Sequence, residues 1–422
     1  MTLLFAQRPF WQRHCAQPQS NQDQVAHSLD IFGELQLDLF LQALQLTLSE
    51  VDVFRLRFNH RGESDMTDNE VMCEVLDLSH LAQAANIANQ QIEADLHSEK
   101  SLFDSQLTRL QLYRLSRQQH RLYLRSHHIL LDGYGMMLIE QRLCQAYAAL
   151  LDSQTAAEPL NRYCAYLEEE ARYQTSERAV QDQCFWRHYL DAKPALPITP
   201  VDTDLLFAQE LCFSSELDAT QRSALLKMSE ALRIGWPDLL VALCTLYLSE
   251  AEAESPWVWL PFMNRWGSVA ANIPGLMVNA LPMYVPSGTG QSLAEYLLQT
   301  SQALRRLYHH GRYRIEQIQH DQGLDAEQSY FMSPFINVLP FKPPVIKGCT
   351  TQCQVLAAGS SEGLNITFRG CLTGQMILHI EADVTTYAEE KLRQHANALP
   401  TFLQRWLNQY QQSDGVINTL LA

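Results

Sequence analysis

The chain alternates between two patterns of hydrophobic residues, one with the two-residue period of strands and one with the spacing of amphipathic helices. Short strand-like runs and longer helix-like stretches follow one another through the first half. The strand-like runs are residues 25–31, 107–115 and 120–129, and the helix-like stretches are residues 37–48, 85–104, 134–151 and 160–190. Because the two patterns are interleaved, they predict a mixed α/β fold.

The same pattern begins again in the second half, after a segment punctuated by Pro194, Pro197 and Pro200. Prolines interrupt regular structure, so this segment is a candidate junction between two lobes. The 422 residues are enough for two lobes that each have a core of their own. Beyond the prolines, strands are predicted at residues 210–214 and from residue 257, and helices at residues 220–232, 237–248 and 293–308.

The net charge of −16 limits the kinds of molecule that we expect the chain to bind. Proteins that bind nucleic acid nonspecifically neutralise phosphates with Lys and Arg, so we expect no nucleic-acid partner. An acidic chain would suit a cationic substrate through long-range attraction. The alternative is that the acidic surface serves solubility alone.

Neither the apolar runs nor the cysteines point to a membrane or a metal. No apolar run approaches the roughly 20 residues that span a bilayer. The N-terminus has no basic residues ahead of its short apolar run, so we expect no signal peptide and a cytoplasmic protein. The ten cysteines include no Cys-x-x-Cys, and only Cys349 and Cys353 are close together. We therefore predict reduced thiols and no metal site.

Residues 126–135 bring together a group of reactive side chains. A strand ends there at His127 and His128, a turn follows at Asp132 and Gly133, and a helix begins. Gly is free to adopt the positive φ that such turns often need. Adjacent strand residues point to opposite faces, so only one of the two histidines can face a given cleft. The plain alternative is a core strand with hydrogen-bonded histidines.

The pattern His127-His128-x-x-x-Asp132-Gly133 resembles the core motif of the chloramphenicol-acetyltransferase-like acyltransferases. These include dihydrolipoyl transacylases and the condensation domains of nonribosomal peptide synthetases. Seven segments resemble condensation-domain motifs in the same order, namely residues 6–11, 52–58, 126–135, 257–267, 275–282, 310–318 and 333–337. The chain is therefore identified as a member of the condensation-domain family. In detail it is similar, nearly end to end, to the free-standing amide synthases that assemble catechol siderophores such as vibriobactin.

This resemblance implies an α/β fold of two chloramphenicol-acetyltransferase-like lobes, residues 1–177 and 178–422, in a V with a central tunnel. It implies that His128 faces the tunnel as a base or hydrogen-bond acceptor, with His127 facing the core. Asp132 is expected to pair with Arg265 across the lobes without touching substrate. Asn337 and Trp266, from the second lobe, are candidates for positioning substrate; for Trp266, simple packing remains an equal alternative.

The resemblance also implies the substrates. The donor would be an aryl thioester, 2,3-dihydroxybenzoyl on the phosphopantetheine arm of an aryl carrier protein acting in trans. The acceptor would be a soluble polyamine, norspermidine. We expect no bound cofactor, no metal, no membrane partner and a monomer. The alternatives are an acyltransferase that uses acyl-CoA, a condensation domain whose amine is carrier-bound, and a noncatalytic carrier-docking module.

Two further motifs are interpreted as decoys, and one motif is missing. Residues 359–363 fit the Gly-x-Ser-x-Gly pattern of hydrolases, but a strand-like run follows where a hydrolase needs a helix, so we predict a loop. The pair His309-His310 closes a predicted helix, where the helix dipole favours histidine. The chain has no Gly-Gly-x-Ser carrier motif, so we expect other chains to deliver its substrates.

Overall fold

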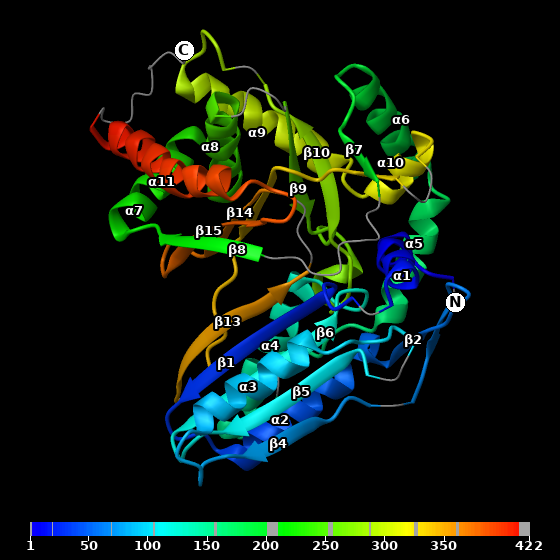
Figure 1. Ribbon diagram of the computed structural model, residues 1–422, viewed down its shortest axis with the longest axis vertical. Coiled ribbons are helices and arrows are strands. Elements are labelled where there is room, and N and C mark those ends of the chain that lie inside the picture. Colours follow the sequence, from blue (N-terminus) through cyan, green and yellow to red (C-terminus); the bar gives the residue numbers. More distant parts are fainter. Residues whose placement is uncertain are drawn as a thin grey trace. The chain divides into compact units, whose positions relative to one another are not determined.

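The computed structural model describes residues 2–18, 20–68, 70–103, 106–155, 158–200, 210–251, 256–286, 288–324, 328–359 and 363–412. The chain divides into two compact units, and neither is continuous in sequence. The first unit comprises Met1–Glu177, Met263–Val278 and Pro343–Ser360. The second comprises Arg178–Phe262, Asn279–Lys342 and Ser361–Ala422. Figure 1 labels most of the elements of both.

A five-stranded sheet with the order β13-β1-β6-β5-β4 forms the centre of the first unit. All neighbours are antiparallel except β4 and β5, which are parallel. The elements of this unit are α1 (Arg8–Ala16), β1 (Gln24–Phe32), α2 (Leu37–Glu50), β2 (Leu56–Phe58), β3 (Ser64–Met66), β4 (Cys73–Asp77), α3 (Ala84–His97), β5 (Thr108–Arg114), β6 (Gln119–His127), α4 (Gly133–Leu151), α5 (Tyr163–Gln174) and β13 (Thr350–Ala358), with 3-10 turns at Phe5–Gln7, Asp52–Arg55 and Val269–Asn272.

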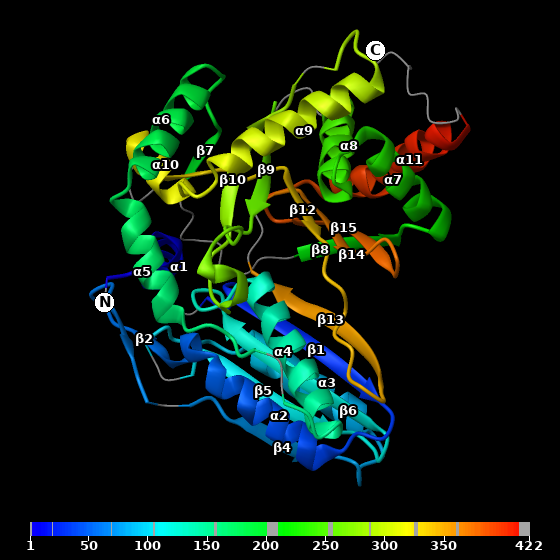
Figure 2. The ribbon, with the colours of Figure 1, turned by 180° about the vertical axis from the view of Figure 1, so that it is seen from behind.

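Helices cover both faces of this sheet, and each face contributes buried apolar side chains. On one face, Ala88 and Ile92 of α3 pack against Tyr123 of β6. On the other face lie α2 and α4 (Figures 1 and 2). Their buried side chains pack against each other and against Leu122 and Leu124. Residues of β6 therefore alternate between two covered faces, one apolar at Leu122 and Leu124 and one mixed, where Tyr123 lies between the ion-paired Arg121 and Arg125. The strand is covered on both faces up to its end at His127.

A six-stranded sheet with the order β10-β9-β12-β14-β15-β8 forms the centre of the second unit. Helices α7, α8, α9 and α11 pack with it into one apolar core that includes Trp259, Ile336 and Ile380. The elements are α6 (Glu177–Asp191), β7 (Ile198–Pro200), β8 (Glu210–Glu216), α7 (Ala219–Leu232), α8 (Trp236–Ala251), β9 (Trp257–Phe262), β10 (Asn279–Tyr284), α9 (Leu293–His309), α10 (Ile315–Asp321), β11 (Gln328–Tyr330), β12 (Phe335–Leu339), β14 (Asn365–Gly370), β15 (Met376–Asp383) and α11 (Glu389–Gln412).

The mixed α/β class and the predicted elements on described residues agree with the structure, and most ends differ by one to three residues. The long stretch 160–190 is two helices, α5 and α6, and α3 ends at His97, short of residue 104. The proline segment is not the junction, because β7 (Ile198–Pro200) pairs with β11 inside the second unit. Nor does a single division after residue 177 describe the units, because Met263–Val278 and Pro343–Ser360 belong to the first.

Two further findings concern the membrane and thiol predictions. Among the described residues, no single helix has the length and apolar composition to cross a membrane. Helices α7 and α8 pass that test only as a pair, bent by 101° at their break. All ten cysteines are free thiols.

Candidate active site

The site lies where β6 ends and α4 begins, entirely within the first unit. The backbone N–H of His127 donates to the carbonyl of Leu107, at 2.7 Å, and that of His128 to the carbonyl of Asp23, at 2.9 Å. These bonds come from the segments preceding β5 and β1, so neighbouring strands fix both histidines at the end of the sheet. A short turn at residues 128–130, followed by two residues of irregular backbone, then leads into α4.

His127 is a buried, structural histidine. Its Nδ1 accepts a hydrogen bond from the backbone N–H of Ile129, at 3.1 Å, and its side chain is almost wholly buried. Burial lowers the pKa of His127 to about 4, so the ring is neutral at pH 7. The orientation that the family resemblance implies, with His127 toward the interior, is what the structure has.

His128 is only partly buried, and its ring is stacked on an aromatic side chain. The Phe10 ring lies 5.0 Å from it, centroid to centroid, at an interplanar angle of 20°. Among the described residues, Nδ1 of His128 is buried and has no hydrogen-bond partner. Burial lowers the pKa of His128 below its ordinary value. At pH 7 the imidazole is therefore neutral and can accept a proton or a hydrogen bond.

Asp132 is the buried centre of a hydrogen-bond network at the start of α4. Its Oδ1 accepts the backbone N–H of Gly135 at 2.8 Å, which makes Asp132 the N-cap of the helix. Its Oδ2 accepts the backbone N–H groups of Met277 and Val278, at 2.9 and 3.0 Å. Nη2 of Arg265 donates to both oxygens, at 2.8 and 3.0 Å. All acceptor sites of this carboxylate are used within the protein.

Arg265 ties the returning segment Met263–Val278 to α4. Besides Asp132, its guanidinium donates to the carbonyls of Ala270, Ile273 and Gly275, at 2.8 to 3.0 Å. Burial raises the pKa of the Asp132 carboxyl, but the charge of Arg265 and the backbone donors outweigh burial, so the pKa lies below its ordinary value. The predicted pair is present; the expectation that it joins two lobes is wrong, because both residues lie in the first unit.

The glycine that this turn needs is Gly135 rather than Gly133. Gly133 is exposed, has no positive φ, and a Cβ there would meet nothing within 4 Å. A Cβ on Gly135 would lie 2.7 Å from Cδ1 of Leu131 and 2.9 Å from the backbone N of Gly275. Gly135 therefore permits the close approach of the returning segment to α4, a contact that no local pattern in the sequence could indicate.

The two predicted substrate-positioning residues lie in different units. Trp266 belongs to the first unit, next to Arg265, and not to the second lobe as expected. Its side chain is 82% exposed, so it is not a core packing residue. Asn337 lies on β12 of the second unit, opposite Thr367 of β14. The Oδ1 of Asn337 is buried and, among the described residues, has no hydrogen-bond partner.

Sequence reasoning did not assign roles to several neighbours of the histidines. Phe10 lies on α1, and the guanidinium of Arg13 lies 5.3 Å from the centre of its ring. Arg13 also forms an ion pair with Asp23, at 2.9 Å. The buried side chain of Gln7 reaches the carbonyl of Ile129, at 3.5 Å. The one indication of these neighbours in the sequence was the Ala-Gln-aromatic pattern at residues 6–11. It identified a family motif but not the residues that the motif contacts.

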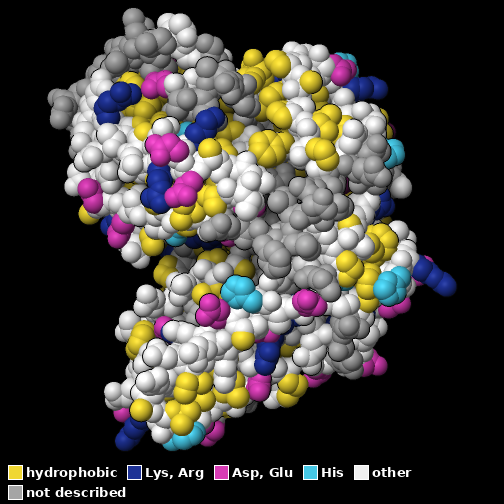
Figure 3. Space-filling view, viewed as in Figure 1, with side chains coloured by type: hydrophobic (Ala, Val, Ile, Leu, Met, Phe, Trp, Pro, Cys, Tyr) yellow, Lys and Arg dark blue, Asp and Glu magenta, His cyan; other side chains and the backbone are white. Residues whose placement is uncertain are grey.

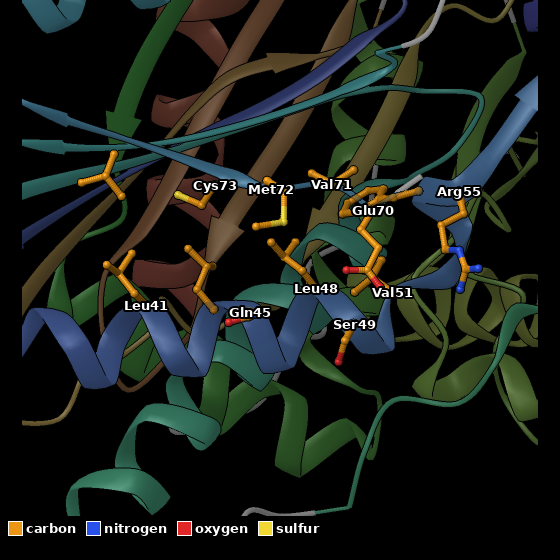
Figure 4. A pocket seen from close by; sticks show the side chains of 13 residues that line it. Leu41, Gln45, Leu48, Ser49, Val51, Arg55, Glu70, Val71, Met72 and Cys73 are labelled. Atoms are coloured by element: carbon orange, nitrogen blue, oxygen red, sulfur yellow. The ribbon is translucent and has the colours of Figure 1, made fainter. Parts of the chain in front are cut away.

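Two other places could hold a ligand. Among the described residues, His27, Glu140 and Cys353 have potential metal ligand atoms within 4.8 Å of one another, although Nδ1 of His27 and Oε1 of Glu140 are already hydrogen-bonded, at 2.7 Å. A pocket of about 210 Å³ lies between α2 and residues 70–75 (Figure 4), lined mainly by apolar side chains such as Leu48 and Met72. Among the described residues that line it there is no histidine, so they offer no general base of the kind found at the end of β6.

This geometry supports one kind of chemistry. A neutral, partly exposed imidazole sits at the end of a rigid strand, and the nearby carboxylate is fully engaged in structure. Such a site can accept a proton from a nucleophile bound beside it, or orient that nucleophile through a hydrogen bond. The carboxylate of Asp132 has no free lone pair with which to act as the base.

A family model described as "Condensation domain" matches residues 1–421. The chain therefore belongs to the condensation-domain family. Its fold and its His127-His128-x-x-x-Asp132-Gly133 motif are those of the amide-forming condensation enzymes of nonribosomal peptide synthesis, and it is an enzyme of this class.

Among solved structures, it is similar to VibH, an NRPS condensation enzyme, with 50% identity and a TM-score of 0.95 over 100% of this chain and 99% of that one. Curated relatives include the dimodular nonribosomal peptide synthase of Bacillus subtilis (strain 168) and enterobactin synthase component F of Escherichia coli O157:H7. Each is 26% identical over 96% of this chain. The chain spans only 17% and 32% of their respective lengths.

Proposed function

We propose that this condensation enzyme joins an aryl acid, carried as a thioester, to a soluble polyamine. The donor is 2,3-dihydroxybenzoyl on the phosphopantetheine arm of an aryl carrier protein that acts in trans, and the acceptor is norspermidine. The product is the amide of a catechol siderophore. The observation that carries the proposal is the similarity to VibH, which extends over the whole of both chains, together with a neutral His128 at the end of β6.

In this reaction the thiolate leaves readily, whereas the amine must be unprotonated before it can attack. A thiol has a pKa of about 8.5, so the thiolate leaves without a strong acid. An alkyl amine has a pKa of roughly 10.4, by analogy with Lys, and is mostly protonated at pH 7. His128 accepts the proton that the attacking nitrogen loses, or holds the unprotonated amine by a hydrogen bond. Its lowered pKa keeps the imidazole neutral and available.

The other motif residues act by holding His128 and the turn in place. His127 anchors the strand end through Ile129. Asp132 is committed to Arg265 and three backbone N–H groups, so its contribution is structural. Gly133 begins α4. We assign substrate positioning to Trp266, because a large aromatic side chain is exposed, and to Asn337, because its Oδ1 is buried without a partner.

The charge of the chain fits a cationic acceptor. A net charge of −16 attracts a polyamine over long range and raises its encounter rate at low salt. On the face shown in Figure 3, acidic and basic side chains are interspersed. The attraction on this face therefore comes from the net charge of the whole chain and not from one acidic patch. An acidic carrier protein would be repelled by the same field, so its docking must depend on local contacts.

The siderophore context also rests on the relatives. One curated relative is named for enterobactin synthesis, and the chain matches it over 96% of its own length. Because the chain spans a third or less of the two curated relatives described above, their whole activities are not carried over. What is carried over is the condensation step and the carrier-bound form of the donor.

One assay tests the proposal against its alternatives. The enzyme is incubated with 2,3-dihydroxybenzoyl-loaded aryl carrier protein and a panel of amines: norspermidine, spermidine, 1,3-diaminopropane and an aminoacyl-loaded carrier. Products are identified by mass spectrometry. We expect amide with norspermidine. Product formed only from the carrier-bound amine would identify a condensation domain whose acceptor is carrier-bound. Product formed only when 2,3-dihydroxybenzoyl-CoA replaces the loaded carrier would identify an acyltransferase that uses acyl-CoA. No amide with any pair would indicate a docking module.

A further inference from the structure

The returning strand β13 brings one glycine to the edge of the His128 ring. Strand β13 pairs with β1, with Ala358 opposite Val25, and β1 pairs with β6, with Gln24 opposite His127. Just past the end of β13, the backbone N–H of Gly359 donates to the carbonyl of Gln24, at 2.9 Å. The register of three strands therefore sets Gly359 at the level of the two histidines.

No side chain fits at position 359 without moving the imidazole. A Cβ built on Gly359 would lie 2.7 Å from Cδ2 of His128 and 3.2 Å from Nε2, closer than non-bonded carbon atoms approach. The φ of Gly359 is +89°, a conformation that glycine adopts readily and other residues rarely. The backbone thus approaches the Cδ2–Nε2 edge of the ring, and Phe10 covers its face.

We infer that Gly359 is a positioning residue for His128: by lacking a side chain, it lets the imidazole lie between the end of β13 and Phe10 in one fixed orientation. The inference rests on the proposed role of His128 in the reaction. It concerns Nε2 in particular, because Nδ1 is buried, and a group at position 359 would crowd the nitrogen left to face the amine. A misplacement of about 1 Å can cost about 100-fold in rate.

The steric conflict concerns the end of a side chain and not the backbone. A methyl group at position 359 can be accommodated if the imidazole rotates away, so we expect Gly359→Ala to fold. The chain offers a matched control in Gly348, which precedes β13. Its φ of +80° is equally unfavourable for alanine, but a Cβ there would meet nothing within 4 Å. Gly348→Ala therefore reproduces the backbone strain without touching His128.

The decisive experiment is a double-mutant cycle on kcat. We compare Gly359→Ala, His128→Ala and the double variant, with Gly348→Ala as control. We expect Gly359→Ala to lower kcat by 10-fold or more, no further than His128→Ala does, and to cost nothing more in the His128→Ala background, where the ring is gone. Gly348→Ala should keep the parent kcat. Losses that multiply in the double variant would overturn the inference.

A second measurement does not depend on activity. In protein labelled with 15N at histidine, the His128 resonances should shift, and their titration midpoint should change, in Gly359→Ala but not in Gly348→Ala. An unchanged His128 signal in Gly359→Ala would overturn the inference. If His128→Ala retains the parent activity, the proposed role of His128 fails, while the spectra still decide whether Gly359 orients the ring. If Gly359→Ala does not fold, the double variant should regain the fold; failure to regain it would exclude His128 as the obstacle.

Discussion

Replacing Asp132 by alanine should destabilise the first unit, whatever it does to catalysis. The substitution leaves the guanidinium of Arg265, which is 2% exposed, without its carboxylate. It also leaves the backbone N–H groups of Gly135, Met277 and Val278 without their acceptor. Removing one partner of a buried ion pair typically costs about 3–5 kcal/mol. Because Arg265 keeps its three backbone carbonyl acceptors, we expect the lower end of this range, about 3 kcal/mol.

Two companion variants separate the charge from the hydrogen bonds. Asp132→Asn keeps one oxygen acceptor and the shape of the side chain, so it should lose less stability than Asp132→Ala. Pairing Asp132→Ala with Arg265→Met removes both charges, and the double variant should be more stable than the sum of the single losses predicts. Such recovery would identify the stranded guanidinium as the main cost.

The pH dependence follows from the direction of the shift. The pKa of Asp132 is lower in the folded protein than in the unfolded chain. The carboxylate therefore adds stability above its unfolded pKa of about 3.9, and this stability is lost as the pH falls through the folded value. The pH-dependent part of the stability below pH 4 should be smaller in Asp132→Asn than in the parent.

The measurement is urea denaturation at pH 7.5, followed by circular dichroism and tryptophan fluorescence, with amide formation assayed on the same preparations. Asp132→Ala should lose stability and activity together. An unchanged unfolding midpoint with lost activity would refute this reasoning, because Asp132 would then act on the reaction and not on the fold.

Three other outcomes are expected. His128→Ala should stay folded and lower kcat by about 100-fold, near the bottom of the usual range for general-base help, whereas His127→Ala should lower the melting temperature more. Protonation of the amine lowers kcat/KM in both proteins as the pH falls. Because the pKa of His128 is lowered, the parent should show an additional fall in kcat/KM only below pH 6.5, and His128→Ala should lack that additional fall. Added salt should slow the reaction at subsaturating amine, and it should slow the reaction of a triamine more than that of a diamine. If salt changes neither rate, electrostatic attraction of the amine is excluded. Trp266→Ala and Asn337→Ala should each lower kcat by about as much as His128→Ala does. If both variants keep the parent kcat, proton transfer contributes more to the rate than substrate positioning does.

The elements of this fold were predictable because local periodicity reports which face of a strand or helix is buried. Alternation predicted only that His127 and His128 face opposite ways, and the family resemblance supplied which of the two is buried; in the structure His127 is buried and His128 is partly buried. The pair between Asp132 and Arg265, 133 positions apart, followed only from the family resemblance. No local pattern couples two such distant residues.

The assignment of Met263–Val278 and Pro343–Ser360 to the first unit could not be predicted either, because it also depends on contacts between residues far apart in the chain. Met263–Val278 reads in sequence as the continuation of β9, and nothing in its composition indicates that Arg265 and Trp266 belong to the first unit. The sequence interpretation of residues 359–363 as a loop before a strand agrees with β14 at Asn365–Gly370, although residues 360–362 lie outside the described part. It gave no hint that Gly359 reaches His128, because that contact depends on the register of three strands.

The return of β13 to the first unit has a consequence for how the chain is made. Until residue 358 has been synthesised, β1 has a partner on one side only and exposes a nine-residue edge of unpaired backbone groups. At 5–20 residues per second, the ribosome needs roughly 10 to 35 s to extend the chain from residue 177 to residue 358. For about the first half of that interval, until residue 265 has been added, the N-terminal part also lacks Arg265 for Asp132. The nascent chain thus presents an open sheet edge to chaperones and to neighbouring polysomes, and a fragment of residues 1–177 would keep that edge permanently.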